Sequence, residues 1–318
     1  MTRHFSPLTI AIVVAIAAVG LVALPQVLPS YYLGLVVKAL IFALFAMSLD
    51  LLIGYAGMAS LGHAAYFGLA AYSAGLLAQK LEWNFWLAVP VTLAITGTTA
   101  LLFGFLALRT RGSYFLMITL ALSQLIWGMA VGWRSLTGGT DGLPNLPRPD
   151  LMQFVSLNNE VTFYYFVLIV VTVAGFFIFQ IAASPFGYVL RGIRESETRM
   201  LALGYDVKRY RLSIFVISAL FAGLAGILYM YFNRFVSPEF LHVERSAEVL
   251  LMVVLGGAGT LVGPIVGAAA IIGLENLASA FTERWLMILG AVYVMVALFA
   301  PKGLIGAVKS LVRRKEQP

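Results

Sequence analysis

The chain has 318 residues, of which 61% are hydrophobic and only 11% are charged, and its mean hydropathy is +0.94. Soluble domains carry about a quarter charged residues, so this composition excludes a soluble globular protein and predicts one that lies in a membrane. The absence of cysteine excludes disulfides, thiolate metal sites and cysteine nucleophiles. The net charge of +7 fits basic loops that set membrane topology, and nucleic acid is not an expected partner.

Several apolar runs are long enough to cross a hydrocarbon core as helices. We predict an all-α polytopic membrane protein, a single transmembrane domain over residues 1–318, with about 8 to 10 transmembrane helices. The first run is longer than the core of a signal peptide and is interpreted as a retained anchor. In chain order the runs lie at 8–28, 33–53, 56–77, 85–108, 114–133, 163–181, 212–232, 247–277 and 285–300.

Basic residues predict the orientation of these runs. They gather at 109–111, at 191–211 and in the tail at 309–315. The positive-inside rule places all three, and with them both termini, in the cytoplasm. Counting crossings between them then requires residues 247–277 to enter and leave on the same side, as a re-entrant pair or two short spans. The same count puts residues 134–160 outside, as the longest external loop.

Two of the apolar runs are rich in glycine. One is DLLIGYAGMASLGHAAYFGLAAYSAG (50–75), the other is LGGAGTLVGPIVGAAAIIG (255–273), and both contain the pattern G-x-A-G. Irregular backbone at membrane depth is tolerated only where protein buries it or where it lines a cavity. We therefore predict interior, broken or tightly packed segments, the second of them re-entrant. The shared pattern also suggests two structural repeats.

Two interpretations of these glycines remain open. Small residues are typical of close helix packing in any membrane bundle. Interrupted segments in corresponding halves also indicate a transport site between repeats. His63 by itself is more typical of a hydrogen-bonded packing residue, and Asp50 is interpreted as an interfacial charge. The candidate path-lining residues are Gly57, Ser60, Gly62, His63, Gly256, Gly257 and Gly259.

The basic loop at 184–211, SPFGYVLRGIRESETRMLALGYDVKRYR, carries its own helix signals. Ser184 before proline predicts one helix start, Ser196 predicts another, and Gly204 predicts the end of a short helix at 197–203. Such a helix fits into a cleft of a partner protein or, equally, lies on anionic membrane lipid. Its apolar contact residues are predicted to be Met200, Leu201 and Leu203, and its ionic ones Arg194, Glu195 and Arg199.

Five motifs then follow one another in a characteristic order. They are GYAGMASLGHAAYFGLAAYSAG, RGSYFLMITLALSQLI, SLTGGTDGL, SPFGYVLRGIRESETRMLALGYDVKRYRLSIFVISALFAGLAG and VLGGAGTLVGPIVGA. In this order they resemble the LivM-type permease subunits of ABC importers for branched-chain amino acids. The resemblance covers residues 50–270, most of the chain.

The resemblance implies a subunit of the cell inner (plasma) membrane that binds no cofactor or metal. Its implied partners are a second related permease, two cytoplasmic ATPase subunits and a periplasmic solute-binding protein. It also implies that the loop at 184–211 forms the coupling helix that docks on an ATPase. Many ABC permeases have a Glu-Ala-Ala motif where this chain has RESETRMLALG, so the coupling residues carry over by position only. They are Arg194, Glu195, Glu197, Leu201 and Gly204. The external loop is either a docking surface for the binding protein or a flexible loop.

No enzymatic activity is predicted. The chain has no GxxxxGK[ST] phosphate loop, so ATP hydrolysis is expected on the separate ATPase subunits. Two other classes remain as alternatives. A secondary transporter needs an acid or cation site at the membrane midplane, for which only Glu275 is a candidate. A membrane enzyme needs convergent titratable groups, and three scattered histidines do not supply them. The solute is left open among branched-chain amino acids, other amino acids, urea, amides and aromatic acids.

Overall fold

The computed structural model describes residues 20–152 and 155–281, together with the single positions 284, 287, 290, 291, 294, 295 and 303. Six helices in these residues are long and apolar enough to cross a membrane. The prediction of an all-α polytopic membrane protein is therefore confirmed. Most of the first apolar run, most of the run at 285–300 and the basic tail lie outside the described residues.

Long helices follow the predicted runs closely, and short elements join them. The elements in chain order are α2 (Ser30–Asp50), the π-helix η1 (Leu51–Tyr55), α3 (His63–Lys80), α4 (Phe85–Ala107), α5 (Ser113–Gly132), α6 (Arg134–Thr137), the 3-10 helix η2 (Gly139–Asp141), β1 (Asp150–Met152), β2 (Val155–Ser156), α7 (Glu160–Ala183), α8 (Pro185–Glu195), α9 (Glu197–Ala202), α10 (Val207–Asn233), the 3-10 helix η3 (Pro238–Leu241), α11 (Val243–Gly256) and α12 (Val262–Phe281). The two short strands pair antiparallel as a hairpin.

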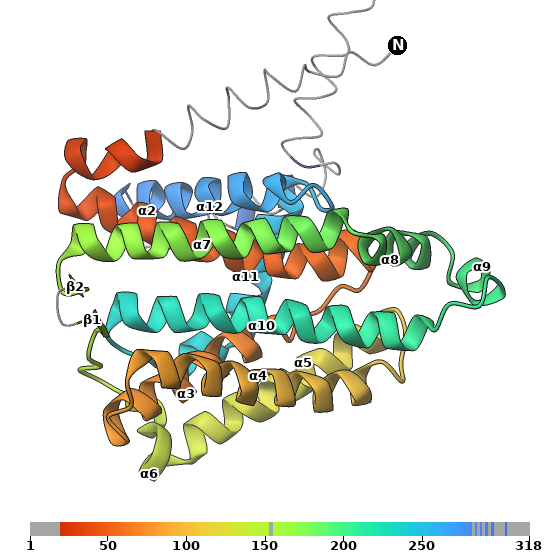
Figure 1. Ribbon diagram of the computed structural model, residues 1–318, viewed down its shortest axis with the longest axis horizontal. Helices are drawn as coiled ribbons and strands as arrows, with labels where there is room; N and C mark the ends of the chain where they lie inside the picture. Colours follow the sequence, from red (N-terminus) through yellow and green to blue (C-terminus); the bar gives the residue numbers. More distant parts are fainter. Residues whose placement is uncertain are drawn as a thin grey trace, which may run out of the picture.

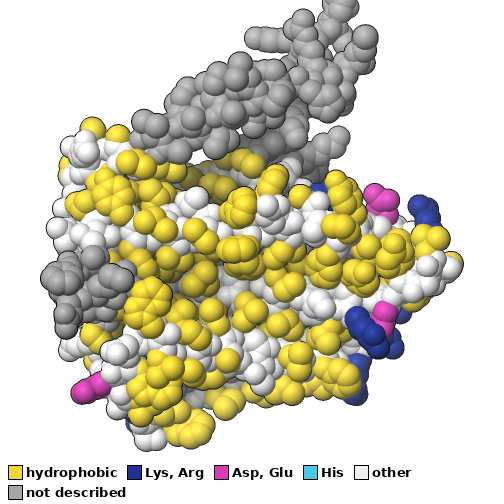
Figure 2. All heavy atoms as spheres, in the orientation of Figure 1, with side chains coloured by type: hydrophobic (Ala, Val, Ile, Leu, Met, Phe, Trp, Pro, Cys, Tyr) yellow, Lys and Arg dark blue, Asp and Glu magenta, His cyan; other side chains and the backbone are white. Residues whose placement is uncertain are grey.

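The bundle has central and peripheral helices (Figure 1). We compared an apolar stretch of 18 residues from each span. In the span Ser30–Tyr55 72% of this stretch is buried and in α10 61%, against 22% in α4 and 28% in α5. The peripheral helices expose large apolar side chains such as Phe105, Met117 and Phe176. Figure 2 shows this apolar surface along the length of the bundle. Such a surface is stable against lipid or a partner subunit rather than against water.

The two ends of the bundle differ in their loops and in their charge. The helices α8 and α9 lie at one end, which we call the basic end, and Figure 2 shows Lys and Arg side chains gathered there. Arg111 and Arg211 both pair with Glu197, at N–O distances of 3.0 and 3.1 Å, so the loop after α4 and the segment 191–211 share this end. The helix α6 and the strands lie at the opposite end, the loop end, where Leu143 pairs with Val236.

The first glycine-rich segment breaks a span in two. The helix α2 continues as the π-helix η1 to Tyr55, residues 56–62 are not helical, and α3 begins only at His63. A single helix over 56–77 was therefore the wrong expectation, whereas the predicted break is confirmed. The ring of His63 reaches Ser48 of α2, so the non-helical segment turns back from the basic end into the protein before α3 starts.

The second glycine-rich segment forms a hairpin of two helices. After α10 ends at the loop end, the chain turns inward, and α11 starts beside α3, where Ser246 accepts a hydrogen bond from the backbone of Ala64 at 3.0 Å. The helix α11 ends at Gly256 at the basic end, and α12 runs back across the bundle. The segment thus leaves the loop end and returns towards it, as the count of crossings predicted, and because its turn reaches the basic end it fits the alternative of two short spans.

The two units, α2 with α3 and α10 with α11, run in opposite directions. In each unit a long helix is followed by a connection without α-helix, which contains the 3-10 helix η3 in the second unit, and then by a helix that starts inside the bundle. Gly34 lies near Phe232, and Ser48 bonds to Ser218 at 2.5 Å, so α2 and α10 are antiparallel. The two G-x-A-G patterns do not occupy equivalent places in these units. They contact each other instead, because Gly54 packs directly against Gly259.

Candidate functional site

The segment between α7 and α10 folds as its capping residues predict. The Ser184 hydroxyl accepts from the backbone of Gly187, and the Ser196 hydroxyl accepts from the backbone of Arg199, both at 3.4 Å. Gly204 ends α9 with a φ of +84°, in the left-handed region that favours glycine. The segment is therefore an ordered helix pair, α8 and α9, at the basic end.

One face of α9 packs on the protein and the other is exposed. Met200 is buried with Ile193 and Val207, so the expectation that Met200 offers an exposed contact was wrong. Leu201 and Leu203 are 52% and 66% exposed and form the outward apolar surface of this segment. Glu195 and Arg199 are exposed beside them.

Glu197 holds α9 in place. Its carboxylate bridges Arg111 from the loop after α4 and Arg211 from the first turns of α10. The Glu197 side chain is 21% exposed, and both oxygens are engaged within the chain. Glu197 therefore orients α9, and exposed side chains such as Leu201 and Leu203, with Glu195 and Arg199 beside them, are free to contact another molecule.

Arg194 is an exposed residue near the end of α8, and its side chain reaches the two G-x-A-G segments. Its guanidinium donates a hydrogen bond to the carbonyl oxygen of Gly54 in the π-helix η1. A Cβ on Gly57 would lie 2.9 Å from the Arg194 Cγ, and one on Gly259 would lie 3.4 Å from the Arg194 Nη1. Arg194 is thus packed between the two G-x-A-G segments.

Asp50 fastens the second of these segments to α2. Its Oδ1 accepts from the backbone N–H of Gly259 at 2.6 Å, and its Oδ2 accepts from that of Leu261 at 3.1 Å. Asp50 is fully buried, so its interpretation as an interfacial charge was wrong. Arg194 lies within electrostatic range of its carboxylate. Two backbone donors and one nearby cation compensate the buried charge.

The remaining glycines of the candidate path make close backbone contacts. An added Cβ on Gly62 would overlap the carbonyl oxygen of Thr119, and one on Gly256 would overlap that of Gly263. Gly57 is exposed and Gly259 partly so, whereas Gly62, Gly256 and Gly257 are buried. At Gly62 and Gly256 the missing side chain allows the close approach of two backbones.

Ser60 and His63 hold the start of α3. Ser60 is buried and its hydroxyl accepts from the backbone of Gly62 at 3.2 Å. His63 is fully buried, stacks on Phe45 and bonds through Nε2 to the Ser48 hydroxyl at 2.8 Å. Because that hydroxyl donates to the carbonyl of Phe45, Nε2 carries the proton. His63 therefore has the role of a hydrogen-bonded packing residue, as its sequence context predicted.

A second polar cluster lies near the middle of the span Ser30–Tyr55. Lys38 pairs with Glu275 of α12 at 2.9 Å, and Arg245 of α11 pairs with Glu248 at 2.8 Å. Both cations lie about the ring of Phe42, which is halfway along the span, at 5.9 and 6.0 Å from its centroid. The Lys38–Glu275 pair joins α2 to α12, and Arg245 over Phe42 joins α11 to α2. The four charges balance, so the cluster carries no net charge at mid-depth.

Sequence reasoning missed this cluster except for Glu275. The signal was present, because Arg245 and Glu248 are three residues apart at the border of an apolar run, a spacing that places both on one helix face. Lys38 was also visible as a lone cation inside the second apolar run. What the sequence did not reveal is that α2, α11 and α12 meet.

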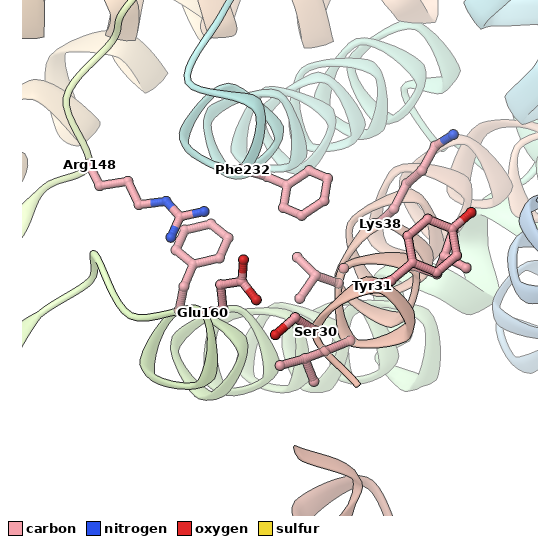
Figure 3. A pocket seen from close by; sticks show the side chains of 11 residues that line it. Ser30, Tyr31, Lys38, Arg148, Glu160 and Phe232 are labelled. Carbon is pink, nitrogen blue, oxygen red and sulfur yellow. The ribbon is translucent and has the colours of Figure 1, made fainter. Parts of the chain in front are cut away.

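A pocket of about 380 Å³ opens towards the loop end between α2, α7 and α10 (Figure 3). Arg148 and Glu160 stand on one side, and Lys38 contributes its stem while its ammonium turns to Glu275. Arg148 lies over the ring of Phe163 at 4.6 Å and donates to the carbonyls of Leu157 and Asn158, both at 3.2 Å. Burial, and then the charge of Arg234, lowers the pKa of Arg148, while Glu160 raises it. The apolar walls are Leu33, Gly34, Leu35, Val37, Phe163 and Phe232.

The chain matches, over residues 31–298, the family described as "Branched-chain amino acid transport system / permease component". It belongs to this family, as the resemblance of its motifs predicted. A helical membrane chain with six candidate spans among its described residues and an ordered helix pair at its basic end fits a transport component.

Individual relatives have the same character. The chain is 28% identical over 298 residues to the high-affinity branched-chain amino acid transport system permease protein LivM of Escherichia coli, covering 87% of this chain and 70% of that protein. It is 26% identical over 213 residues to a probable LivM of Methanocaldococcus jannaschii, covering 62% and 61%. A LivH permease of Salmonella typhimurium is 29% identical over 125 residues, covering 39% of this chain and 40% of that protein. No solved structure matches the chain.

The packing of Gly256 gives a direct test of the hairpin. Gly256→Ala places a methyl group against the fixed backbone of Gly263, and overpacking of this kind destabilises by about 1–3 kcal/mol. Gly273→Ala, on the same hairpin with no atom within 4 Å, is the matched control and is expected to be neutral or stabilising by up to about 1 kcal/mol. Thermal unfolding in detergent measures both. Equal midpoints for the two variants would contradict the close approach of α11 and α12.

Proposed function

We propose that the chain is a permease subunit of an ATP-driven importer, and that α9 is its docking helix for an ATPase subunit. The observation that carries the proposal is the construction of α9. Glu197 and Met200 fix the helix to the body of the protein, while Leu201 and Leu203 remain exposed to the solvent side. An exposed apolar pair on a rigid, ion-paired support is typical of a docking surface.

The burial of Met200 favours docking of α9 on a protein over binding of α9 to the lipid surface. A helix on the membrane surface turns its apolar side towards the acyl chains and surrounds it with basic residues. In α9 the inward apolar residue, Met200, is already covered by Ile193 and Val207. The exposed leucines therefore point away from the body of the protein, where a cleft of a soluble subunit can take them.

The rest of the assembly follows from the family. We place the chain in the inner (plasma) membrane, with both termini and the basic end in the cytoplasm, because positively charged loops remain there. We infer a second, related permease subunit, since the chain is similar to LivH as well as LivM proteins. Two ATPase subunits would dock at the basic end. The segment 134–160 at the loop end is the surface on which a periplasmic solute-binding protein would dock.

Branched-chain amino acids are the proposed solutes, on the strength of the names of the relatives. In this proposal the glycine-rich breaks at 56–62 and 256–261 flank the path formed with the second permease. The pairing of Glu275 with Lys38 disfavours the alternative of a secondary transporter. An acid that binds a coupling ion or proton must release its partner, whereas this one is compensated at mid-depth.

The function is tested by purifying the chain in mild detergent with the products of its neighbouring genes and reconstituting the complex in lipid discs. We expect co-purification of an ATPase and a second permease, and ATP hydrolysis that rises when the binding protein and leucine are added together. Glycerol in place of leucine is the control. A chain that purifies alone and moves leucine along an ion gradient would contradict the proposal.

Docking through α9 is tested separately by Leu201→Asp. A buried charge in an apolar interface lacks a partner, so we expect the affinity for the ATPase to fall at least about tenfold. The matched control is Leu81→Asp at the opposite end, where the leucine is 55% exposed against 52% for Leu201. Pull-down from membranes measures ATPase retained per permease. Equal retention by both variants would defeat the docking assignment.

A further inference from the structure

The link between the docking helices and the membrane breaks runs through two side chains. Arg194 is the last arginine of α8, two residues before the N-cap Ser196 of the docking helix α9. Its stem packs on Gly57, its guanidinium bonds to Gly54, and its tip touches Gly259. A displacement of α9 therefore acts, within a few residues, on a side chain that contacts both G-x-A-G segments.

Asp50 completes the link on the membrane side. It is fully buried at the end of α2, next to the π-helix that contains Gly54. Its two oxygens hold the N–H groups of Gly259 and Leu261, which lie in the turn between α11 and α12. π-helices are rare and occur frequently at functional sites, and here the π-helix supplies the carbonyl that Arg194 binds.

Burial of the turn between α11 and α12 accounts for Asp50 but not for Arg194. Leu261 is 2% exposed and its bond to Asp50 is buried, so its backbone N–H needs an acceptor inside the protein. Arg194 is an exposed residue, and its guanidinium nevertheless bonds to Gly54 beside this carboxylate, two residues before the docking helix begins. Resting on the proposed function, we propose that Asp50 and Arg194 are the positioning residues through which ATPase docking moves the breaks that flank the path.

The link makes the docking helix, η1 and the α11–α12 turn move together. Breaking it frees α8 and α9 from the turn while leaving Leu201 and Leu203 exposed for the ATPase. The complex then still assembles and hydrolyses ATP, but hydrolysis no longer drives the membrane helices. This outcome differs from loss of docking, in which the ATPase is absent.

The test compares Asp50→Asn, Arg194→Ala and Arg194→Lys in the reconstituted complex with its binding protein. The measured quantity is the number of leucine molecules taken up per ATP hydrolysed. We expect this ratio to fall at least about fivefold in Asp50→Asn and Arg194→Ala, the lower end of typical coupling between sites, with the ATPase retained. Arg194→Lys keeps the charge and is expected to recover part of the ratio. Lys208→Ala, which removes an exposed positive charge from the same loop, serves as the control.

The outcomes separate the two proposals. Unchanged uptake per ATP in variants that retain the ATPase would overturn the link while leaving the importer in place. A wild-type complex without ATP-driven uptake would overturn the proposed function and the link together. If the Asp50→Asn complex fails to assemble, the comparison of Arg194→Ala with Arg194→Lys provides the test, because Arg194 is not part of the buried core. A lower yield of folded complex with an unchanged ratio would show a structural role only and would overturn the link.

Discussion

A chain that breaks its helices inside a membrane must find partners for the backbone groups that the breaks release. Asp50 meets this constraint at the turn between α11 and α12, where its carboxylate accepts from Gly259 and Leu261. Each unsatisfied backbone group in a bilayer costs several kcal/mol, roughly as much as the whole margin of stability of many domains. The approach of Gly54 to Gly259 and the hydrogen bond from Arg194 to Gly54 lie directly beside this contact.

The other polar groups obey the same rule at other depths. Ser48 joins α2 to α3 and α10, since its side chain meets His63 and its carbonyl accepts from Ser218. Near the middle of the bundle the Lys38–Glu275 ion pair joins α2 to α12, while Arg245, paired with Glu248 within α11, lies over the ring of Phe42 in α2. Peripheral helices such as α4 carry few contacts of this kind and expose apolar side chains. The polar contacts are thus concentrated in the central helices and at the interruptions between them.

Much of the fold could be predicted from the sequence, because spans, helix starts and helix breaks are each determined by residues that are close together in the chain. Length and composition predict the spans, Ser184 and Ser196 predict the starts of α8 and α9, and glycine content predicts the two breaks. The partners of single charged residues could not be predicted, since they depend on which helices meet. Asp50 lies 209 residues from Gly259 along the chain, and nothing near Asp50 in the sequence indicates a buried carboxylate that binds a distant turn. The prediction for Met200 was wrong for a related reason. Three apolar residues in a short helix do not reveal which of them the body of the protein covers.

The central claim is that the docking helices and the α11–α12 turn behave as one body. The absence of cysteine allows spin labels to be placed at two chosen positions without background, and Thr198 and Ala258 are both exposed. The measurement is the distance between these labels in the assembled complex, without nucleotide and with ATP bound to a hydrolysis-deficient ATPase. The account predicts one narrow distance in both states, while the distance from Thr198 to a label at Leu81 changes. A Thr198 to Ala258 distance that changes as much as the distance to Leu81 would contradict it.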